Sequence, residues 1–150
     1  ISYFSKVDEP TAIVFFGDHQ PNLPEDFYNT LLESQRGDLS DAELRQKKMV
    51  TPFFIWANYD IEEQTNMQIS ANYLSAYALN ALGCSSGFDQ MRLALQQQIP
   101  VMNVNGYRLP DGTWYPQSDQ PENDLLNDYH NAEYAQIFDA KNRSDEWYTP

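Results

Sequence analysis

Two short runs of the sequence contain almost no polar residue and constrain the fold more than any other feature. They are Thr11 to Phe16 (TAIVFF) and Pro52 to Ala57 (PFFIWA), and both are rich in β-branched or aromatic side chains. A strand with one solvent-exposed face alternates apolar and polar residues, whereas a strand buried on both faces does not. We therefore expect two strands of a parallel or mixed sheet with helices on both sides. Two such strands are few, so we expect their other sheet neighbours outside the given sequence.

Helices are predicted between and after the two strands. Asn22 is a candidate N-cap for a first helix, which is expected to end at Gly37. Ser40-Asp41-Ala42-Glu43 is a capping-box pattern and opens a short charged helix through Lys48. Three longer helices are predicted at residues 70–82, 88–98 and 125–138 from their apolar spacing and their flanking residues.

The second half of the chain also carries strand and packing signals. A short strand is expected at 101–104, and a β-hairpin at 107–109 and 113–115, joined by Pro110-Asp111-Gly112 and followed by a polar loop at 117–123. Trp147 and Tyr148 near the end are expected to pack back onto the core. The predicted apolar anchors of the last helix are Leu126, Tyr129, Tyr134 and Ile137.

The charge of the chain limits its partners. Its 22 Asp and Glu against 9 Lys and Arg give a formal charge of −13, which repels phosphate backbones and anionic lipid. We therefore expect no nucleic-acid partner. The single cysteine, Cys84, excludes an internal disulfide, and no apolar run approaches the roughly 20 residues of a membrane span. The sequence opens at Ile1 without a signal peptide, from which we expect an excised or processed piece of a longer protein.

Gly17-Asp18-His19, directly after the first strand, is the best candidate for a chemical site. Ligands of open α/β sheets bind at the carboxyl ends of strands. Asp18 offers a hard oxygen and His19 an imidazole nitrogen, a pair that suits Mn²⁺, Zn²⁺ or Fe²⁺. Both reach one ion only if the backbone turns after Phe16, and we expect Gly17 to permit that turn. The alternative is an ordinary strand-ending turn, with Asp18 as a cap and His19 half-exposed.

Several segments of the chain resemble one protein family. IVFFGDHQP resembles the late metal-binding segment of the sulfatase-like branch of the alkaline phosphatase superfamily, and more narrowly that of the lipoteichoic acid synthase family of bacterial phosphoglycerol transferases. TPFFIWANYD is similar to that family's next core strand, and ISANYLSAYALNALG to the helix after it. In that helix relatives often have a proline that this chain lacks, with Asn72 and Ser75 near the usual polar positions. FDQMRLALQQQIPVMNVNGY and DYHNAEYAQIFD are also similar to members of the family.

The resemblance implies a fold and a domain organisation. The implied fold class is α/β, the C-terminal portion of an alkaline-phosphatase-like or sulfatase-like mixed-sheet sandwich with a small C-terminal hairpin-plus-helix subdomain. Residues 1–150 would be the C-terminal part of the catalytic domain, with a core portion over about 1–99 and the subdomain over about 100–150. The implied partner is the remainder of the same catalytic domain, in a parent protein that is membrane-anchored at the extracytoplasmic face of a bacterial cell.

The resemblance also implies an activity and a set of site residues. Asp18 and His19 correspond to the family's late aspartate and histidine ligands of a divalent ion, typically Mn²⁺. The family's threonine nucleophile and acidic ligand come early in the domain, so no catalytic nucleophile is expected within this chain. The implied substrate is a small glycerophosphate or another phosphate or sulfate ester. True sulfatases use a C/S-x-P-x-R motif, which Cys84 does not match, and we expect Cys84 to be a partly buried residue at a helix end.

Two amides that follow the strands are candidates for substrate contacts. Gln20 and Asn58 are expected on the active-site side, where they could hydrogen-bond a phosphate or glycerol group. Loop capping is the alternative role for both. At the level of the whole chain, the alternative to an enzyme fragment is a non-catalytic binding or structural module in which GDHQP is only a turn.

Overall fold

The computed structural model describes residues 1–33, 37, 39–119 and 122–150, and it is a mixed α/β structure. The described part contains five α-helices and two small sheets, which confirms the predicted α/β class. It divides into two compact units, Ile1–Tyr59 and Asp60–Pro150. No helix among the described residues is both long and apolar enough to cross a lipid bilayer.

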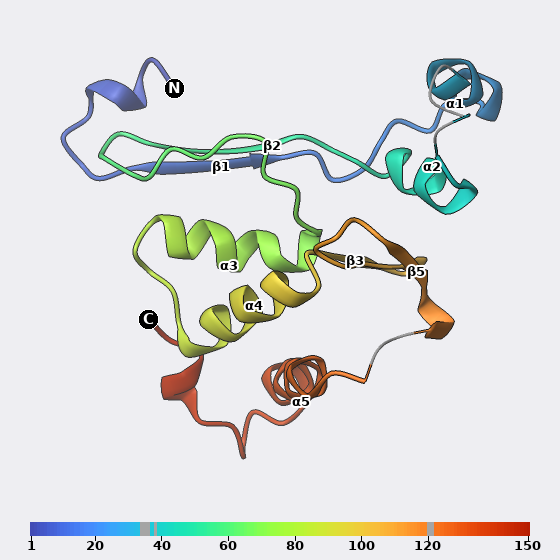
Figure 1. Ribbon diagram of the computed structural model, residues 1–150. Coiled ribbons are helices and arrows are strands. Elements are labelled where there is room, and N and C mark those ends of the chain that lie inside the picture. The colour runs from blue at the N-terminus through green and yellow to red at the C-terminus, as the bar shows by residue number, and fades with distance from the viewer. Residues whose placement is uncertain (34–36, 38, 120–121) are drawn as a thin grey trace. The chain divides into compact units, whose positions relative to one another are not determined.

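The first unit is built on a two-stranded antiparallel ribbon, formed by β1 (Ala12–Phe16) and β2 (Phe53–Ala57). Ala12 pairs with Ala57 and Phe16 with Phe53, so the carboxyl end of β1 lies beside the start of β2. The segment between the strands carries α1 (Glu25–Leu32) and α2 (Asp41–Lys47), which lie beyond that end of the ribbon in Figure 1.

The two helices of this unit begin in different ways. Ser40 caps α2 with the predicted capping box, because its hydroxyl accepts from the Glu43 amide while the Glu43 carboxylate accepts from the Ser40 amide. The expected cap at Asn22 is wrong. Pro24, with extended backbone angles, precedes α1 and gives no side-chain cap. Part of the predicted span up to Gly37 lies outside the described residues.

None of the ten ribbon residues is fully buried, so the ribbon is only partly covered on each face. Phe15 and Phe16 are each more than half exposed, and Phe54 is 42% exposed. The Phe15 and Phe54 rings stack on one face, with centroids 5.2 Å apart. The expectation of strands buried on both faces is therefore not met within this chain, although their composition is that of buried strands.

The second unit contains the core that the chain forms by itself. It comprises α3 (Ala71–Ala81), α4 (Gly87–Gln98), α5 (Asp124–Phe138) and a three-stranded antiparallel sheet with the order β3 (Val101–Asn103), β4 (Gly106–Arg108) and β5 (Trp114–Pro116). α4 packs against both α3 and α5. The core residues that bind these elements together are Tyr73, Phe88, Leu95, Ile99, Tyr107, Leu126, Tyr129 and Ala132.

The C-terminal tail packs against the start of α4, as its aromatic residues predict. The Tyr148 and Trp147 rings lie 5.2 and 5.8 Å from the Phe88 ring, and the Tyr148 hydroxyl donates to the Ala132 carbonyl at 2.8 Å. Two predicted anchors on α5 are wrong for this chain, because Tyr134 and Ile137 are each more than 60% exposed.

The division between compact units differs from the expected division near residue 99. The structure divides after Tyr59, because the hairpin and α5 share one core with α3 and α4. Part of the predicted polar loop at 117–123 forms a short 3-10 helix, Gln117–Asp119, and residues 120–121 of it lie outside the described residues.

Gly106 provides a test of the small sheet. Its φ is +152°, and a Cβ at this position would lie 2.0 Å from the Tyr115 carbonyl oxygen. We expect Gly106→Ala to lower the free energy of unfolding by about 1–3 kcal/mol, since both the backbone angle and the contact with β5 are unfavourable to any side chain. Urea unfolding followed by circular dichroism measures the change.

Gly112 is the matched control for this substitution. It also has a positive φ, +90°, but a Cβ there would have no atom within 4 Å. Gly112→Ala should therefore lower the free energy of unfolding less than Gly106→Ala does. Equal losses in the two variants would contradict the close approach of β4 to β5.

Candidate metal-binding turn

The turn after β1 is held against the entry to β2. The Gly17 amide donates to the Pro52 carbonyl at 3.0 Å, and the Gln20 side-chain amide donates to the Val50 carbonyl. A Cβ on Gly17 would lie 3.0 Å from Thr51 Cβ. The two segments approach so closely that any larger residue here would have to displace Thr51 by a few tenths of an ångström. The backbone does turn here, as expected, but without a left-handed angle, since Gly17 is not among the residues with positive φ.

Asp18 and His19 converge at the surface of this turn. The Asp18 Oδ2 and His19 Nε2 atoms lie 3.3 Å apart, and both side chains are more than three-quarters exposed. This confirms the geometric expectation that a carboxylate and an imidazole turn toward one solvent-facing point. The metal-binding role of the pair stays a prediction.

The backbone of the turn orients both side chains. Asp18 Oδ1 accepts from the His19 amide at 2.9 Å, which directs Oδ2 toward the imidazole. His19 Nδ1 lies 2.9 Å from the Gln20 carbonyl oxygen. A carbonyl oxygen only accepts, so Nδ1 carries the proton in this bond and the other ring nitrogen, Nε2, has its lone pair free in the neutral ring. Metal-binding histidines are commonly oriented by such a bond.

The donor set fits a divalent cation. A neutral imidazole nitrogen and a carboxylate oxygen that face each other are both electron-pair donors and need a proton or a cation between them. For metal–ligand bonds of about 2.1 Å, neighbouring ligand atoms are about 3.0–3.4 Å apart in octahedral and tetrahedral sites. The observed 3.3 Å lies in this range. Among the described residues no group of three or more His, Cys, Asp or Glu side chains could hold a metal ion. Asp18 and His19 alone are two potential donors, fewer than the ligands of a complete metal site.

The two candidate substrate amides are not brought together. Gln20 lies in the turn with Asp18 and His19, and its amide nitrogen is engaged by Val50. Asn58 follows the other end of β2 beside Thr11, because the pairing is antiparallel. Five strand residues, about 17 Å, separate the two ends of the ribbon. The expectation that Asn58 shares the active-site side with Gln20 is therefore wrong in this structure.

Asn58 has a structural role at its own end of the ribbon. Its side-chain oxygen accepts from the Thr11 amide at 2.8 Å, and its side-chain nitrogen donates to the Val7 and Glu9 carbonyls, each at 3.0 Å. These bonds fasten the N-terminal segment to β2, the loop-capping role named as the alternative. A substrate contact of Asn58 stays a prediction, and the other candidate site residues lie at the opposite end of the ribbon.

The sequence predicted the charged helix through Lys48 but not that its basic end lies near the turn. Arg45, Lys47 and Lys48 lie within four positions at the end of α2, shortly before Val50, whose carbonyl accepts from Gln20. Charge patterning along the chain was the signal that could have identified them.

Cys84, expected to be partly buried, is exposed.

The comparisons with known proteins place the chain in a family. The fold and the turn define a class of protein. It is a mixed α/β structure in which a carboxylate and an imidazole, both possible metal ligands, directly follow an apolar strand. The family model described as Sulfatase matches residues 1–84, more than half of the chain and all of the turn. The chain belongs to the sulfatase family, a family of sulfatase-like hydrolases and transferases. No curated protein matches the chain. No solved structure matches it either.

Proposed function

We propose that this chain is part of a divalent-metal-dependent phosphoglycerol transferase or sulfatase-like hydrolase. Its substrates are cell-envelope glycerophosphate or other phosphate and sulfate esters. Asp18 and His19 supply two ligands of the ion, which is Mn²⁺ by the family resemblance, and the nucleophile comes from residues outside this chain. The observation that carries the proposal is the convergence of Asp18 Oδ2 and His19 Nε2 within 3.3 Å at an exposed strand end, in a chain of the sulfatase family.

The residues of the turn have distinct roles in this proposal. A divalent ion bound there would act as a Lewis acid and neutralise charge on the ester oxygens. Asp18 presents one carboxylate oxygen while its other oxygen is held by the His19 amide. His19 presents Nε2 because its Nδ1 proton is held by the Gln20 carbonyl. Gln20 lies nearest to the pair and is the proposed contact for a phosphate or glycerol group.

The exposed ribbon supports the proposal that the chain completes a larger domain. All ten residues of β1 and β2 are apolar, and three of their phenylalanines are more than 40% exposed. Strands of this composition are stable when sheet neighbours and helices cover them. We propose that the remainder of the catalytic domain covers them. The parent protein is proposed to be membrane-anchored at the extracytoplasmic face of a bacterial cell.

Metal titration of the chain and its variants tests the proposed ligands. Addition of Mn²⁺ is expected to give weak saturable binding, followed by water-proton relaxation or by the loss of the free-ion paramagnetic resonance signal. Asp18→Ala and His19→Ala should each weaken this binding about tenfold or more, because each removes one of two converging donors.

An acidic surface attracts cations without a site, so the control is another exposed carboxylate. Asp8→Ala removes one negative charge from the same unit at a position outside the turn. It should leave the affinity nearly unchanged. If Asp18→Ala and Asp8→Ala have the same effect, the turn is not a metal site, and the non-catalytic alternative with a simple strand-ending turn is the better account.

A further inference from the structure

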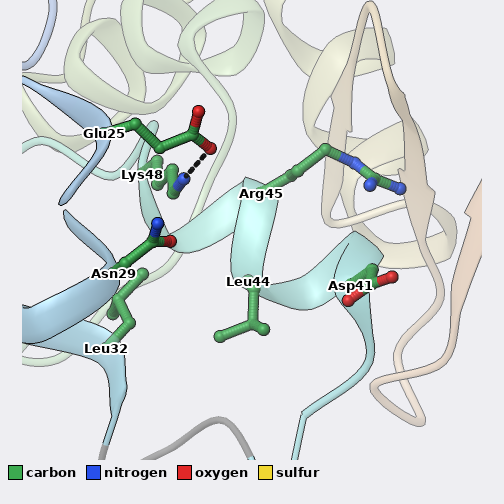
Figure 2. A pocket seen from close by; sticks show the side chains of 7 residues that line it. All are labelled: Glu25, Asn29, Leu32, Asp41, Leu44, Arg45 and Lys48. Carbon is green, nitrogen blue, oxygen red and sulfur yellow. Dashed lines mark hydrogen bonds and ion pairs between the residues drawn. The ribbon is translucent and has the colours of Figure 1, made fainter.

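The hollow between α1 and α2 in the first unit carries opposite charges in equal number. Figure 2 shows around it the acidic side chains of Glu25 and Asp41 and the basic side chains of Arg45 and Lys48. Lys48 Nζ is already paired with Glu25 Oε1 at 3.3 Å. Such a lining has no net charge that would select a ligand. A more reactive feature lies in the second unit, in the two-residue turn between β3 and β4.

The turn between β3 and β4 places Asn105 directly before Gly106. Asn105 is the only asparagine in the sequence that precedes a glycine. Glycine has no Cβ, so the backbone nitrogen that follows Asn105 can approach its side chain without hindrance. The turn is open to water, because Val104 is 86% exposed and Asn105 is also exposed. The pair therefore combines the sequence and the exposure that favour spontaneous loss of the side-chain amide.

The reaction at this pair needs no co-reactant other than water. The Gly106 backbone nitrogen attacks the side-chain carbonyl carbon of Asn105, and a new C–N bond forms. The side-chain nitrogen leaves as ammonia and takes the proton that the Gly106 amide gives up. One water molecule then opens the resulting five-membered succinimide. Opening at the side-chain carbonyl gives aspartate, and opening at the main-chain carbonyl gives isoaspartate.

The small sheet both fixes the glycine and restrains it. A Cβ at Gly106 would lie 2.0 Å from the Tyr115 carbonyl oxygen, so a residue with a side chain cannot replace it unless β5 moves. Gly106 also pairs with Asn103 across the turn, which limits the movement of its amide. The attack therefore requires brief opening of a ladder to which β3 contributes three residues.

We propose that Asn105 is a site of spontaneous covalent modification, deamidation through a succinimide, and that its isoaspartate product weakens the small sheet. Isoaspartate adds one methylene group to the backbone between β3 and β4. The longer backbone displaces Gly106, which has no free space toward β5, and with it Tyr107, a core residue that is 6% exposed. Aspartate leaves the length of the backbone unchanged.

Two other exposed positions should react more slowly for different reasons. Asn142 lies in the turn after α5, but Arg143 follows it and its side chain hinders the attack. Asp111 precedes Gly112 and forms the same succinimide from its protonated carboxyl, by loss of water. The Thr113 amide donates to Asp111 Oδ1 at 2.9 Å and holds the pKa of this carboxyl below its usual value. Asp111 therefore stays ionised, the form that does not lose water.

Prolonged incubation of the full chain at mildly alkaline pH, followed by peptide mass spectrometry with electron-transfer fragmentation, tests the site. Asn105 should be the first residue to gain about 1 Da and should yield both aspartate and isoaspartate. Asn142, and Asn103 in the same hairpin, should react about tenfold or more slowly, because each precedes a residue with a side chain. The rate at Asn105 should rise with pH, since the attacking amide must lose its proton. Asp111 should form isoaspartate more slowly than Asn105.

Urea unfolding of the incubated chain tests the effect on the sheet. The fraction that carries isoaspartate should unfold at a lower urea concentration than the fresh chain, and Asn105→Gln should prevent both the mass gain and this loss. Asn105→Asp carries the new charge without the extra methylene and should unfold near the wild-type midpoint. The modification site is overturned if Asn105 shows no mass gain, or if Asn103 or Asn142 reacts as fast. Wild-type stability of the isoaspartate form would overturn the effect on the sheet.

Discussion

Arg92→Ala is expected to lower the free energy of unfolding of the second unit by about 3–5 kcal/mol, the loss typical when one partner of a buried ion pair is removed. The Arg92 guanidinium pairs with the Asp89 carboxylate, and their side chains are only 13% and 6% exposed. It also donates to the Ser75 hydroxyl at 2.9 Å and to the Asn72 carbonyl at 3.2 Å. Urea unfolding followed by tryptophan fluorescence measures the loss.

The electrostatics of Asp89 explain why the loss is large. Burial by itself raises the pKa of this carboxyl, but hydrogen bonds from Ser86 and Arg92 outweigh the burial and hold the pKa below its usual value. Asp89 is therefore charged at neutral pH, and its Oδ2 serves as the acceptor in the capping box that begins α4. Without Arg92 the charge stays buried without its cation. The Phe88 ring, whose centre lies 4.7 Å from the Arg92 guanidinium, also loses this cation–π contact.

Arg143 provides a matched control for Arg92. It too pairs with an aspartate, Asp145 at 3.0 Å, and lies over an aromatic ring, that of Tyr148, but the Asp145 side chain is 78% exposed. Arg143→Ala should lower the free energy of unfolding by about 1 kcal/mol or less through loss of the ion pair. The double variant Arg92→Met with Asp89→Asn should recover part of the loss, since no unpaired charge remains. A loss at Arg92 no larger than at Arg143 would contradict the buried network.

The features that local sequence patterns encode were predictable. The two apolar runs form strands, and the positions of α2 to α5 agree with the predicted ranges within two residues. Ser40 with Glu43 specifies its capping box because both partners lie within one helical turn. The convergence of Asp18 and His19 was also predictable, since adjacent side chains meet when the backbone turns at the strand end.

The features that depend on distant segments were not predictable. An apolar strand signals burial but not the direction of its neighbour, so the antiparallel pairing that separates Asn58 from Gln20 had no sequence signal. The tight contact at Gly17 is made by Thr51, thirty-four positions later in the chain. Tyr134 and Ile137 have the spacing of core residues on α5, yet no part of the described chain buries them. Spacing identifies an apolar face without identifying what packs on it.

Replacing Phe15 and Phe54 together with threonine is expected to weaken self-association of the chain on the order of a hundredfold. The two rings stack on an only partly covered face of a ribbon whose ten residues are all apolar. Exposed strands of this kind pair with other chains. Burial of each half-exposed ring contributes about 1.4 kcal/mol, so loss of both gives the stated factor. Sedimentation velocity over a range of concentrations measures the association, and threonine keeps the β-propensity of both strands.

A control variant separates association through the ribbon from nonspecific association through any exposed aromatic side chain. Phe138, at the end of α5, is 71% exposed, more than Phe15 or Phe54, but it lies outside any strand. Phe138→Ser should leave the association nearly unchanged if the ribbon is the contact surface. A wild-type chain that stays monomeric at high concentration, or an equal effect of Phe138→Ser, would contradict this account. In the parent protein, the proposed cover from the rest of the catalytic domain should suppress the same association, because a buried ribbon has no free face to present.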